Sequence, residues 1–242
     1  MGTLSDLWNS LDFSAMLSAL MRLIAVFLCL TVHETCHGLA AYALGDPTAK
    51  REHRLSLNPL HHIDWVGLAC MLVLGFGWAK PVPVNPNNFR HYRSGSFWTS
   101  AAGIITNYIS AFLFCPIALW VGEYFFPNSS VITYGHEFVF HLTQLLFSYS
   151  LSFCVFNLLP FYPLDGFRMV DALNKKHGKV YRFLRNYGYY ILMGLIILSF
   201  VARTLAKRVL FFGYFDILGY VMTFATNILG WPITAFWELI LL

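Results

Sequence analysis

Long apolar runs separated by short polar stretches make up most of this 242-residue chain. Each of the longest runs approaches or exceeds the roughly 20 residues that an α-helix needs to cross a bilayer. They predict five crossings, at about 22–42, 98–121, 138–158, 187–203 and 209–229. A shorter apolar piece follows Pro232, and its pattern leaves open whether it forms a sixth. We therefore expect an all-α polytopic membrane protein with five to six transmembrane helices.

Two further segments have apolar patterns that are too one-sided or too short to span. Residues 1–21 carry apolar side chains at helical spacing, which predicts an amphipathic helix in the membrane interface. Between the first two crossings, residues 64–86 hold an apolar core of only about 14 residues, which favours a re-entrant segment. Its tail, residues 80–84, is rich in proline and favours extended chain. The expected parts are the interfacial segment (1–21), a membrane core (22–186) that carries the candidate chemistry, and C-terminal transmembrane helices (187–242).

The composition agrees with a membrane protein and excludes several other classes. The chain is 57% hydrophobic and 12% charged, whereas a soluble domain carries about 25% charged residues. Its five cysteines all lie in apolar segments and show no paired spacing, so we expect no disulfide framework. The net charge of +4 comes without a soluble basic module, and we expect no nucleic-acid binding. The N-terminus lacks a basic region and a small-residue cleavage site, so we expect no cleavable signal peptide.

Lysine and arginine predict the orientation of the crossings. The stretches 45–96 and 159–186 carry six each, whereas residues 1–21 and the loop 122–137 carry none. The N-terminus is therefore expected outside, and the first and third crossings should end in the cytoplasm. Three basic residues fall on the opposite side of this scheme: Arg203, Lys207 and Arg208.

The stretch LTVHETCHGLAAYALG (residues 30–45) places titratable side chains in the first predicted crossing. Such groups are costly in a membrane and are functional candidates by default. His33 and His37 are four residues apart on one helix face, so both imidazoles can bind one metal ion. Glu34 is placed to act as general base, which completes the H-E-x-x-H pattern of zinc metalloproteases. The alternative is a set of interhelical hydrogen bonds that satisfies the three polar groups, and Cys36 is interpreted as a packing residue.

A catalytic metal site needs a third protein ligand and an open fourth position. With Arg22 at the outer surface and a rise of about 1.5 Å per residue, His33 lies roughly 16 Å inward, in the cytoplasmic half of the membrane. Asp165, in NLLPFYPLDGFRM (157–169), fits this depth. Pro160 and Pro163 end the third crossing before it and leave its carboxylate in irregular backbone, which is tolerated only inside protein or beside water.

Other candidates for the third ligand are weaker. Depth excludes His136 and His141, which open the third crossing on the far side. Asp216 is expected in the middle of the fifth crossing and is a lesser contender. Four residues on the correct side follow the basic surface loop and are better interpreted as interfacial: His53, His61, His62 and Asp64.

H-E-x-x-H on one predicted membrane helix and N-x-x-P-x-x-P-L-D-G at the end of another resemble the motifs of the site-2 protease family of intramembrane zinc metalloproteases. The similarity extends through SLNPLHHIDWVG (56–67) and GWAKPVPVNPNNFR (77–90), so it covers roughly residues 30–170. The chain is similar to the compact bacterial and archaeal members, and its short loops leave no room for a PDZ or CBS domain. One departure is AAGIITN (101–107), where the family commonly has a proline after the glycine; Ile104 replaces it here, whereas Gly103 and Asn107 remain.

The resemblance implies that His33, His37 and Asp165 bind one zinc ion per chain and that Glu34 is the catalytic base. Asn157 would stabilise the oxyanion or position substrate, and a helix-packing hydrogen bond is its alternative role. The implied function is a zinc metalloendopeptidase of regulated intramembrane proteolysis, cutting membrane-anchored protein substrates within or near their transmembrane segments. Its expected place is a prokaryotic inner membrane, with the active site in the cytoplasmic half. Residues 80–84 are expected either to pair with unwound substrate as an added strand or to serve as a tether.

Two other functions stay open at this point. A membrane metal transporter also lines its path with histidine and aspartate, but we find no internal repeat of the kind that transporters frequently carry. A catalytically silent scaffold of the same family would keep the fold without turnover, although the four motif residues His33, Glu34, His37 and Asp165 are intact. Beyond substrate and lipid bilayer, the sequence names no regulatory partner.

Overall fold

The computed structural model describes residues 13–74, 77–125 and 134–241, and this part of the chain is mostly helical, with no β-strand. Five helices are long and apolar enough to cross a membrane: α2 (Phe13–Ala43), α5 (Tyr92–Phe125), α6 (Tyr134–Leu158), α8 (Lys179–Ala206) and α9 (Ile217–Leu241). Shorter helices are α3 (Thr48–Arg51), α4 (Trp65–Leu74) and α7 (Asp165–Leu173), with 3-10 turns η1 (Pro59–His62), η2 (Pro86–Asn88) and η3 (Leu210–Phe215). The prediction of an all-α polytopic membrane protein is confirmed.

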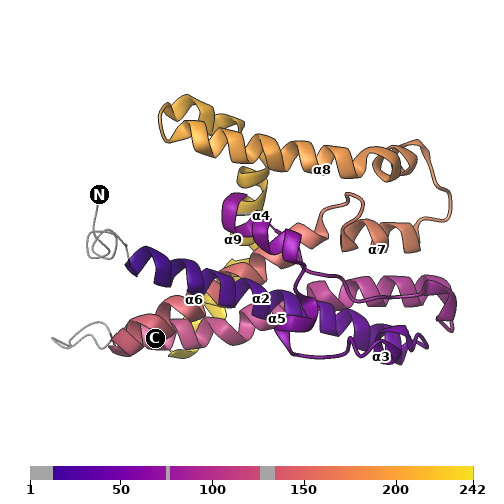
Figure 1. Ribbon diagram of the computed structural model, residues 1–242, viewed down its shortest axis with the longest axis horizontal. Helices are drawn as coiled ribbons and strands as arrows, with labels where there is room; N and C mark the ends of the chain where they lie inside the picture. Colours follow the sequence, from indigo (N-terminus) through magenta and orange to yellow (C-terminus); the bar gives the residue numbers. More distant parts are fainter. Residues whose placement is uncertain (1–12, 75–76, 126–133, 242) are drawn as a thin grey trace, which may run out of the picture.

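Helix α5 is the central element, because it contacts α2, α6, α7 and α9. Small buried residues allow these helices to approach closely. Ala111 and Cys115 of α5 pack with Leu151 of α6 and Ile233 of α9. A second cluster joins α2 to α6 through Ala25, Cys29 and Leu146. Figure 1 shows α8 along one side of the molecule, apart from α2, α5 and α6, and its main contacts are with η3 and α9.

The chain between α2 and α5 has the predicted short helix and extended tail. Helix α4 has ten residues, or about 15 Å, which is half of the roughly 30 Å hydrocarbon core. The Asp64 carboxylate begins it by accepting from the backbone N–H groups of Val66 and Gly67. After Gly77 the chain is extended, and the Lys80 N–H donates to the His62 carbonyl at 2.9 Å. An isolated antiparallel bridge joins Ile63 to Ala79.

The prediction for the fifth crossing, residues 209–229, is wrong in its bounds. Residues Leu210–Phe215 form the turn η3, and α9 begins at Ile217. The Asp216 side chain accepts hydrogen bonds from Ser199, Arg203 and the N–H of Gly219. Asp216 therefore caps the helix instead of lying in its middle. Burial opposes ionisation, but these bonds outweigh it and lower the pKa of the Asp216 carboxyl.

Helix α9 continues through Pro232 to Leu241. A proline inside a membrane helix is tolerated, because neighbouring groups can satisfy the freed backbone. The apolar piece after Pro232 therefore extends the fifth helix, and the described residues contain no sixth helix long and apolar enough to span.

The beginning of α2 bears on the interfacial segment predicted for residues 1–21. Helix α2 already begins at Phe13, so residues 13–21 are continuous with the helix that contains the first crossing. Residues 1–12 lie outside the described part. The division of the chain at residues 21 and 186 stays a prediction.

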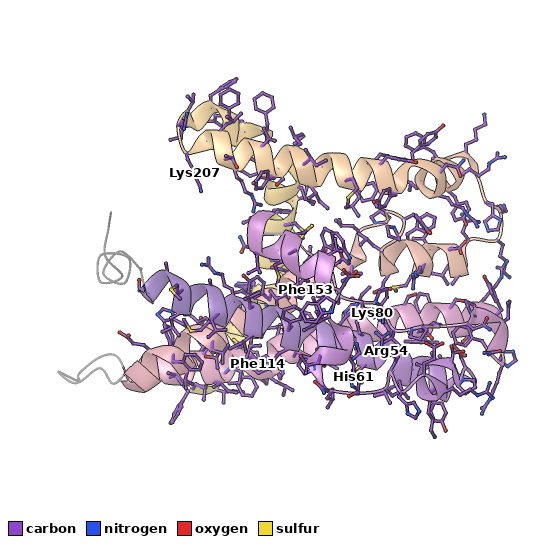
Figure 2. All side chains as sticks on the ribbon, in the orientation of Figure 1. Arg54, His61, Lys80, Phe114, Phe153 and Lys207 are labelled. Atoms are coloured by element: carbon purple, nitrogen blue, oxygen red, sulfur yellow. The ribbon has the colours of Figure 1, made fainter. Side chains whose placement is uncertain are left out.

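The cysteines match the sequence prediction, and the basic residues match it with an exception at Lys207. All five cysteines are free, as predicted. Figure 2 shows Arg54 and Lys80 toward the end of the molecule where α2 finishes, and Lys207 toward the end where α2 begins. Lys207 therefore remains an exception to the orientation rule.

Candidate metal centre

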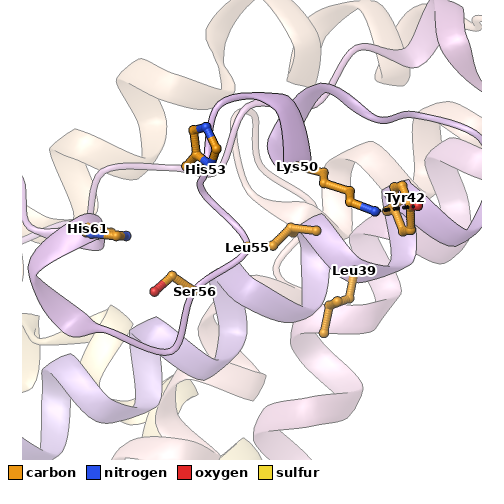
Figure 3. Close-up of a pocket in the computed structure, with 7 residues that line it drawn as sticks. All are labelled: Leu39, Tyr42, Lys50, His53, Leu55, Ser56 and His61. Carbon is orange, nitrogen blue, oxygen red and sulfur yellow. Dashed lines mark hydrogen bonds between the residues drawn. The ribbon is translucent and has the colours of Figure 1, made fainter.

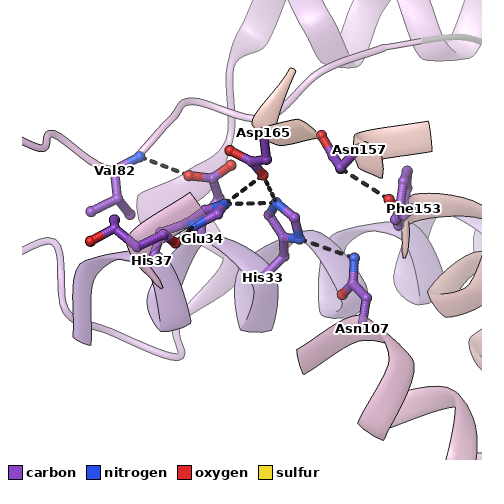
Figure 4. A network of polar contacts seen from close by, with 9 residues as sticks. His33, Glu34, His37, Val82, Asn107, Phe153, Asn157 and Asp165 are labelled. Carbon is purple, nitrogen blue, oxygen red and sulfur yellow. Dashed lines mark hydrogen bonds and ion pairs between the residues drawn. The ribbon is translucent and has the colours of Figure 1, made fainter. Parts of the chain in front are cut away.

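Two histidines of α2 and one aspartate of α7 meet in a buried group (Figure 4). His33 and His37 lie on successive turns of α2, and their Nε2 atoms are 2.9 Å apart. Oδ2 of Asp165 lies 3.2 Å from Nε2 of His33 and 2.9 Å from Nε2 of His37. All three residues are buried, with 3%, 8% and 6% of their surface exposed. The structure thus brings together the three residues that the sequence proposes as ligands.

The turn between α6 and α7 puts Asp165 in this position. Helix α6 ends at Leu158, and Asp165 is the first residue of α7. Between them the Leu164 N–H donates to the Phe161 carbonyl at 2.8 Å, which closes the turn. A Cβ at Gly166 would collide with the backbone carbonyls of Leu158 and Leu159. Glycine therefore lets the beginning of α7 lie against the end of α6.

The donor set fits a bound cation. The Nδ1 atom of His37 lies 2.6 Å from the Thr99 carbonyl oxygen. Because a carbonyl oxygen only accepts hydrogen bonds, Nδ1 carries the hydrogen, and Nε2 of the neutral ring has a lone pair. That lone pair faces Nε2 of His33 and the Asp165 carboxylate, an arrangement that needs a proton or a cation between the atoms. Ligand atoms at about 2.0–2.2 Å from a tetrahedral zinc ion lie about 3.4 Å apart, close to the separations here.

The charge on Asp165 is strongly favoured at this position. Burial opposes ionisation, but when the Nε2 atoms of His33 and His37 carry protons, their hydrogen bonds and charge outweigh it and hold the pKa of the Asp165 carboxyl well below its usual range. An ionised carboxylate is the form that binds a metal. A cation that replaced these protons would meet one carboxylate oxygen and two imidazole nitrogens.

Glu34 lies beside this group and is held from the extended segment. Its Oε2 atom accepts the Val82 backbone N–H at 2.9 Å. The Val82 side chain is buried against Gly38 of α2, where a Cβ would lie 3.0 Å from its Cγ1 atom. The carboxylate is thus fixed near the histidines without belonging to the compact ligand group.

Asn157 lies on α6 next to the turn that carries Asp165 (Figure 4). Its Nδ2 atom donates to the Phe153 carbonyl of its own helix at 3.1 Å. The side chain is partly exposed, and a second N–H of the same amide group is available for another acceptor. The oxyanion role of Asn157 stays a prediction.

Helix α5 supplies residues that contact the candidate ligands and to which the sequence interpretation gave no role. The carbonyl of Thr99 contacts His37 and the side chain of Asn107 contacts His33. Gly103 lies between them and faces both rings, because a Cβ there would be 2.5 Å from His37 Nε2 and 2.6 Å from His33 Cε1. The available signal was the spacing of four residues from Thr99 to Gly103 and from Gly103 to Asn107.

Asp46 is a further residue to which the sequence interpretation gave no role. It is fully buried at the end of α2 and accepts from the backbone N–H of Asn85 at 2.7 Å and from Asn88 Nδ2 at 2.7 Å. Thr48 donates to the same carboxylate from its backbone and its hydroxyl. Burial opposes ionisation, but these bonds outweigh it and lower the pKa of Asp46. Asp46 therefore ties the extended chain after Val84 to the metal-binding helix.

The other sequence candidates lie elsewhere. Asp216 is engaged with Ser199 and Arg203, His62 is fully buried with Nε2 2.8 Å from the Ser56 carbonyl, and the His136 side chain is outside the described part. His53 and His61 are exposed and line a surface pocket of about 470 Å³ beside the end of α2 (Figure 3). None of the candidate ligands His33, His37 and Asp165 lines this pocket. The residues that line it are Leu39, Tyr42, Lys50, His53, Leu55, Ser56 and His61.

Comparison with known proteins agrees with this site. The family model described as Peptidase family M50 matches residues 129–200, which include Asp165. Among curated proteins, "Putative zinc metalloprotease YwhC" of Bacillus subtilis (strain 168) is 37% identical over 150 residues, which cover 62% of this chain and 67% of that protein. No solved structure matches the chain. The chain belongs to peptidase family M50, the site-2 protease family, and is a zinc metalloprotease with membrane-spanning helices.

Proposed function

We propose that this protein is an intramembrane protease that hydrolyses peptide bonds within or near the transmembrane segments of membrane-anchored proteins. The observation that carries the proposal is the meeting of His33, His37 and Asp165 beside Glu34. His33, Glu34 and His37 lie on α2, which is long and apolar enough to span, and Asp165 begins the short helix α7 that follows the spanning helix α6. A soluble metalloprotease has no need to bury its ligands in such helices. The family membership favours this function over a transporter, and the intact set of His33, Glu34, His37 and Asp165 favours it over a catalytically silent scaffold.

His33, His37 and Asp165 would hold one zinc ion, which when bound would polarise the scissile carbonyl and acidify a water molecule. Glu34 takes a proton from the attacking water and delivers it to the leaving amine. The Val82 N–H keeps the carboxylate oriented for both transfers, since it binds Oε2 and leaves Oε1 for the water. Asn157 is the proposed donor to the oxygen of the scissile carbonyl, through the amide hydrogen that its bond to Phe153 does not use.

The location of the site supports an active site in the cytoplasmic half of the membrane. His33 and His37 lie in the half of α2 that ends at Ala43. The stretches that follow α2 and α6 are the ones rich in lysine and arginine, which favours the cytoplasmic side. Water would then reach the zinc site from the cytoplasm.

Substrate would pair with the extended segment 80–84 once its helix is locally unwound. Some of the segment's backbone groups are already occupied: Arg54 donates to the carbonyls of Lys80 and Pro81, and the Val82 N–H binds Glu34. The backbone N–H and carbonyl of Val84 are in none of the hydrogen bonds of the described residues, whereas the next N–H, of Asn85, is bound by Asp46. The two groups of Val84 are therefore the ones proposed to receive an added strand.

The experiment is cleavage of a single-pass membrane substrate by the protein in proteoliposomes. A zinc chelator should abolish cleavage, and Glu34→Gln should lower kcat by roughly 10²–10⁴-fold with zinc content unchanged. Glu52→Gln makes the same chemical change at an exposed position and is the matched control. Full activity of Glu34→Gln, or zinc flux across the vesicle without cleavage, would contradict the proposal.

A further inference from the structure

Each candidate histidine ligand makes a second contact, from its Nδ1 atom to α5. Nδ1 of His37 lies 2.6 Å from the Thr99 carbonyl, and Nδ1 of His33 lies 3.0 Å from the Asn107 amide. Metal-binding histidines commonly donate their other ring N–H to an acceptor, which fixes both the tautomer and the ring orientation. The Thr99 carbonyl is such an acceptor for His37.

Among the described residues, only Asn107 is within hydrogen-bond distance of Nδ1 of His33, and it is completely buried. As drawn, the amide nitrogen faces Nδ1, and the amide oxygen has no partner. The oxygen and nitrogen of an asparagine amide exchange places by a rotation of 180° and are assigned from their hydrogen bonds. The drawn orientation makes Nδ1 an acceptor, so the hydrogen of a neutral His33 sits on Nε2.

A hydrogen on Nε2 of His33 is incompatible with metal binding at that atom. Metal binding moves it to Nδ1, where the amide nitrogen would face it donor to donor. Rotation of the amide puts Oδ1 of Asn107 opposite Nδ1–H and removes this conflict. The rotation moves the unpaired position from the amide oxygen to the amide nitrogen, which costs less than two donors in direct opposition in a buried site.

We propose that Asn107 is a positioning residue for the metal site: its Oδ1 accepts the Nδ1–H of His33 and thereby directs the Nε2 lone pair to the metal. Together Thr99, Gly103 and Asn107 form an α5 cradle, in which two acceptors flank a gap for the rings. The proposal rests on the proposed zinc site. It adds a residue that does not touch the metal and acts through His33.

The test measures zinc affinity of the metal-free protein in detergent, by competition with a chromophoric chelator. Asn107→Leu removes the acceptor at similar volume and should weaken zinc binding roughly 10–100-fold. Asn107→Asp keeps the acceptor oxygens and should stay within roughly threefold of the natural protein, because a carboxylate serves the same orienting role. A purely structural asparagine would not be rescued by aspartate, which buries a charge. Cobalt absorption spectra of the same variants should show the four-coordinate pattern preserved in Asn107→Asp and altered in Asn107→Leu.

Two controls separate this inference from the zinc site itself. Ser100→Ala alters a buried polar residue of the same helix outside the cradle and should leave affinity unchanged. If His33→Ala and Asp165→Ala bind zinc normally, the metal site is wrong. If they lose zinc while Asn107→Leu binds with natural affinity, or if Asn107→Asp is as weak as Asn107→Leu, only the role of Asn107 is wrong. Should Asn107→Leu not fold, Asn107→Ala replaces it in the same comparison.

Discussion

Gly103 faces both candidate histidine ligands, so that Gly103→Ala adds one methyl group at the most sensitive point of the site. The new Cβ would lie 2.5 Å from His37 Nε2 and 2.6 Å from His33 Cε1, whereas ordinary contact begins at 3.4 Å. Either the rings or α5 must therefore give way by about 1 Å, and a displacement of that size is enough to cost roughly 100-fold in rate. The atoms that the methyl group would meet belong to rigid imidazole rings and not to the end of a flexible side chain.

The same substitution changes the stability of the fold much less. Overpacking a buried contact costs about 1–3 kcal/mol, and alanine recovers up to about 1 kcal/mol of helix propensity relative to glycine. The net loss is therefore about 0–3 kcal/mol, less than the roughly 5–15 kcal/mol that stabilises a typical folded protein. Zinc affinity should nevertheless fall at least 10-fold, because the displaced rings no longer direct both Nε2 atoms to one point.

The assay compares zinc affinity and thermal unfolding of Gly103→Ala with those of Gly194→Ala. Gly194 lies in α8, and a Cβ there meets nothing within 4 Å. The control therefore receives the same gain in helix propensity without touching the site, and its zinc affinity should be unchanged. Natural zinc affinity in Gly103→Ala would refute the close packing of α5 against the two rings.

Two further predictions concern the extended chain. Val84→Pro removes a backbone N–H that is proposed to pair with substrate and should raise KM for a membrane substrate. Val84→Ala keeps this N–H and should leave KM unchanged. Equal KM values for the two variants would contradict strand pairing. Asp46→Asn should destabilise the protein by about 1.5–3 kcal/mol at neutral pH, as followed by thermal unfolding. Because the folded pKa of Asp46 lies below the ordinary value of 3.8, its contribution is present above that value and is lost as the pH falls through the folded pKa. The difference between the two proteins should shrink in acid, and a constant difference would contradict this account.

That His33, His37 and Asp165 come together could be predicted from the sequence because the group has two parts, each a local pattern. Four-residue spacing on a helix fixes the common face of His33 and His37, and two prolines followed by Asp-Gly fix a helix end. Depth in the membrane then indicated that the two patterns lie close together, since the third crossing ends on the same side of the membrane as the first. The comparison of depths needed only the rise of a helix and the count of basic residues.

The same reasoning misplaced Asp216, for a physical reason. An apolar run reveals where a helix can lie in lipid, but it does not show where the helix begins. The apolar residues 210–215 form a 3-10 turn, and the first turn of α9 depends on the bonds of Asp216 with Ser199 and Gly219. The capping role of Asp216 involves a partner on α8, which no local pattern displays.

Orientation of the ligands depends on groups still further away in the chain. H-E-x-x-H places two imidazoles on one helix face and leaves their ring rotation and tautomer undetermined. The ring rotation and tautomer of His37 depend on the Thr99 carbonyl, 62 residues later in the chain, and those of His33 depend on the Asn107 amide, 74 residues later. Every residue has a carbonyl, so no sequence signal marks that of Thr99. The spacing T-x-x-x-G-x-x-x-N on α5 nevertheless carries the same kind of information as H-E-x-x-H on α2, because each places its groups on one helix face and the structure packs these two faces together.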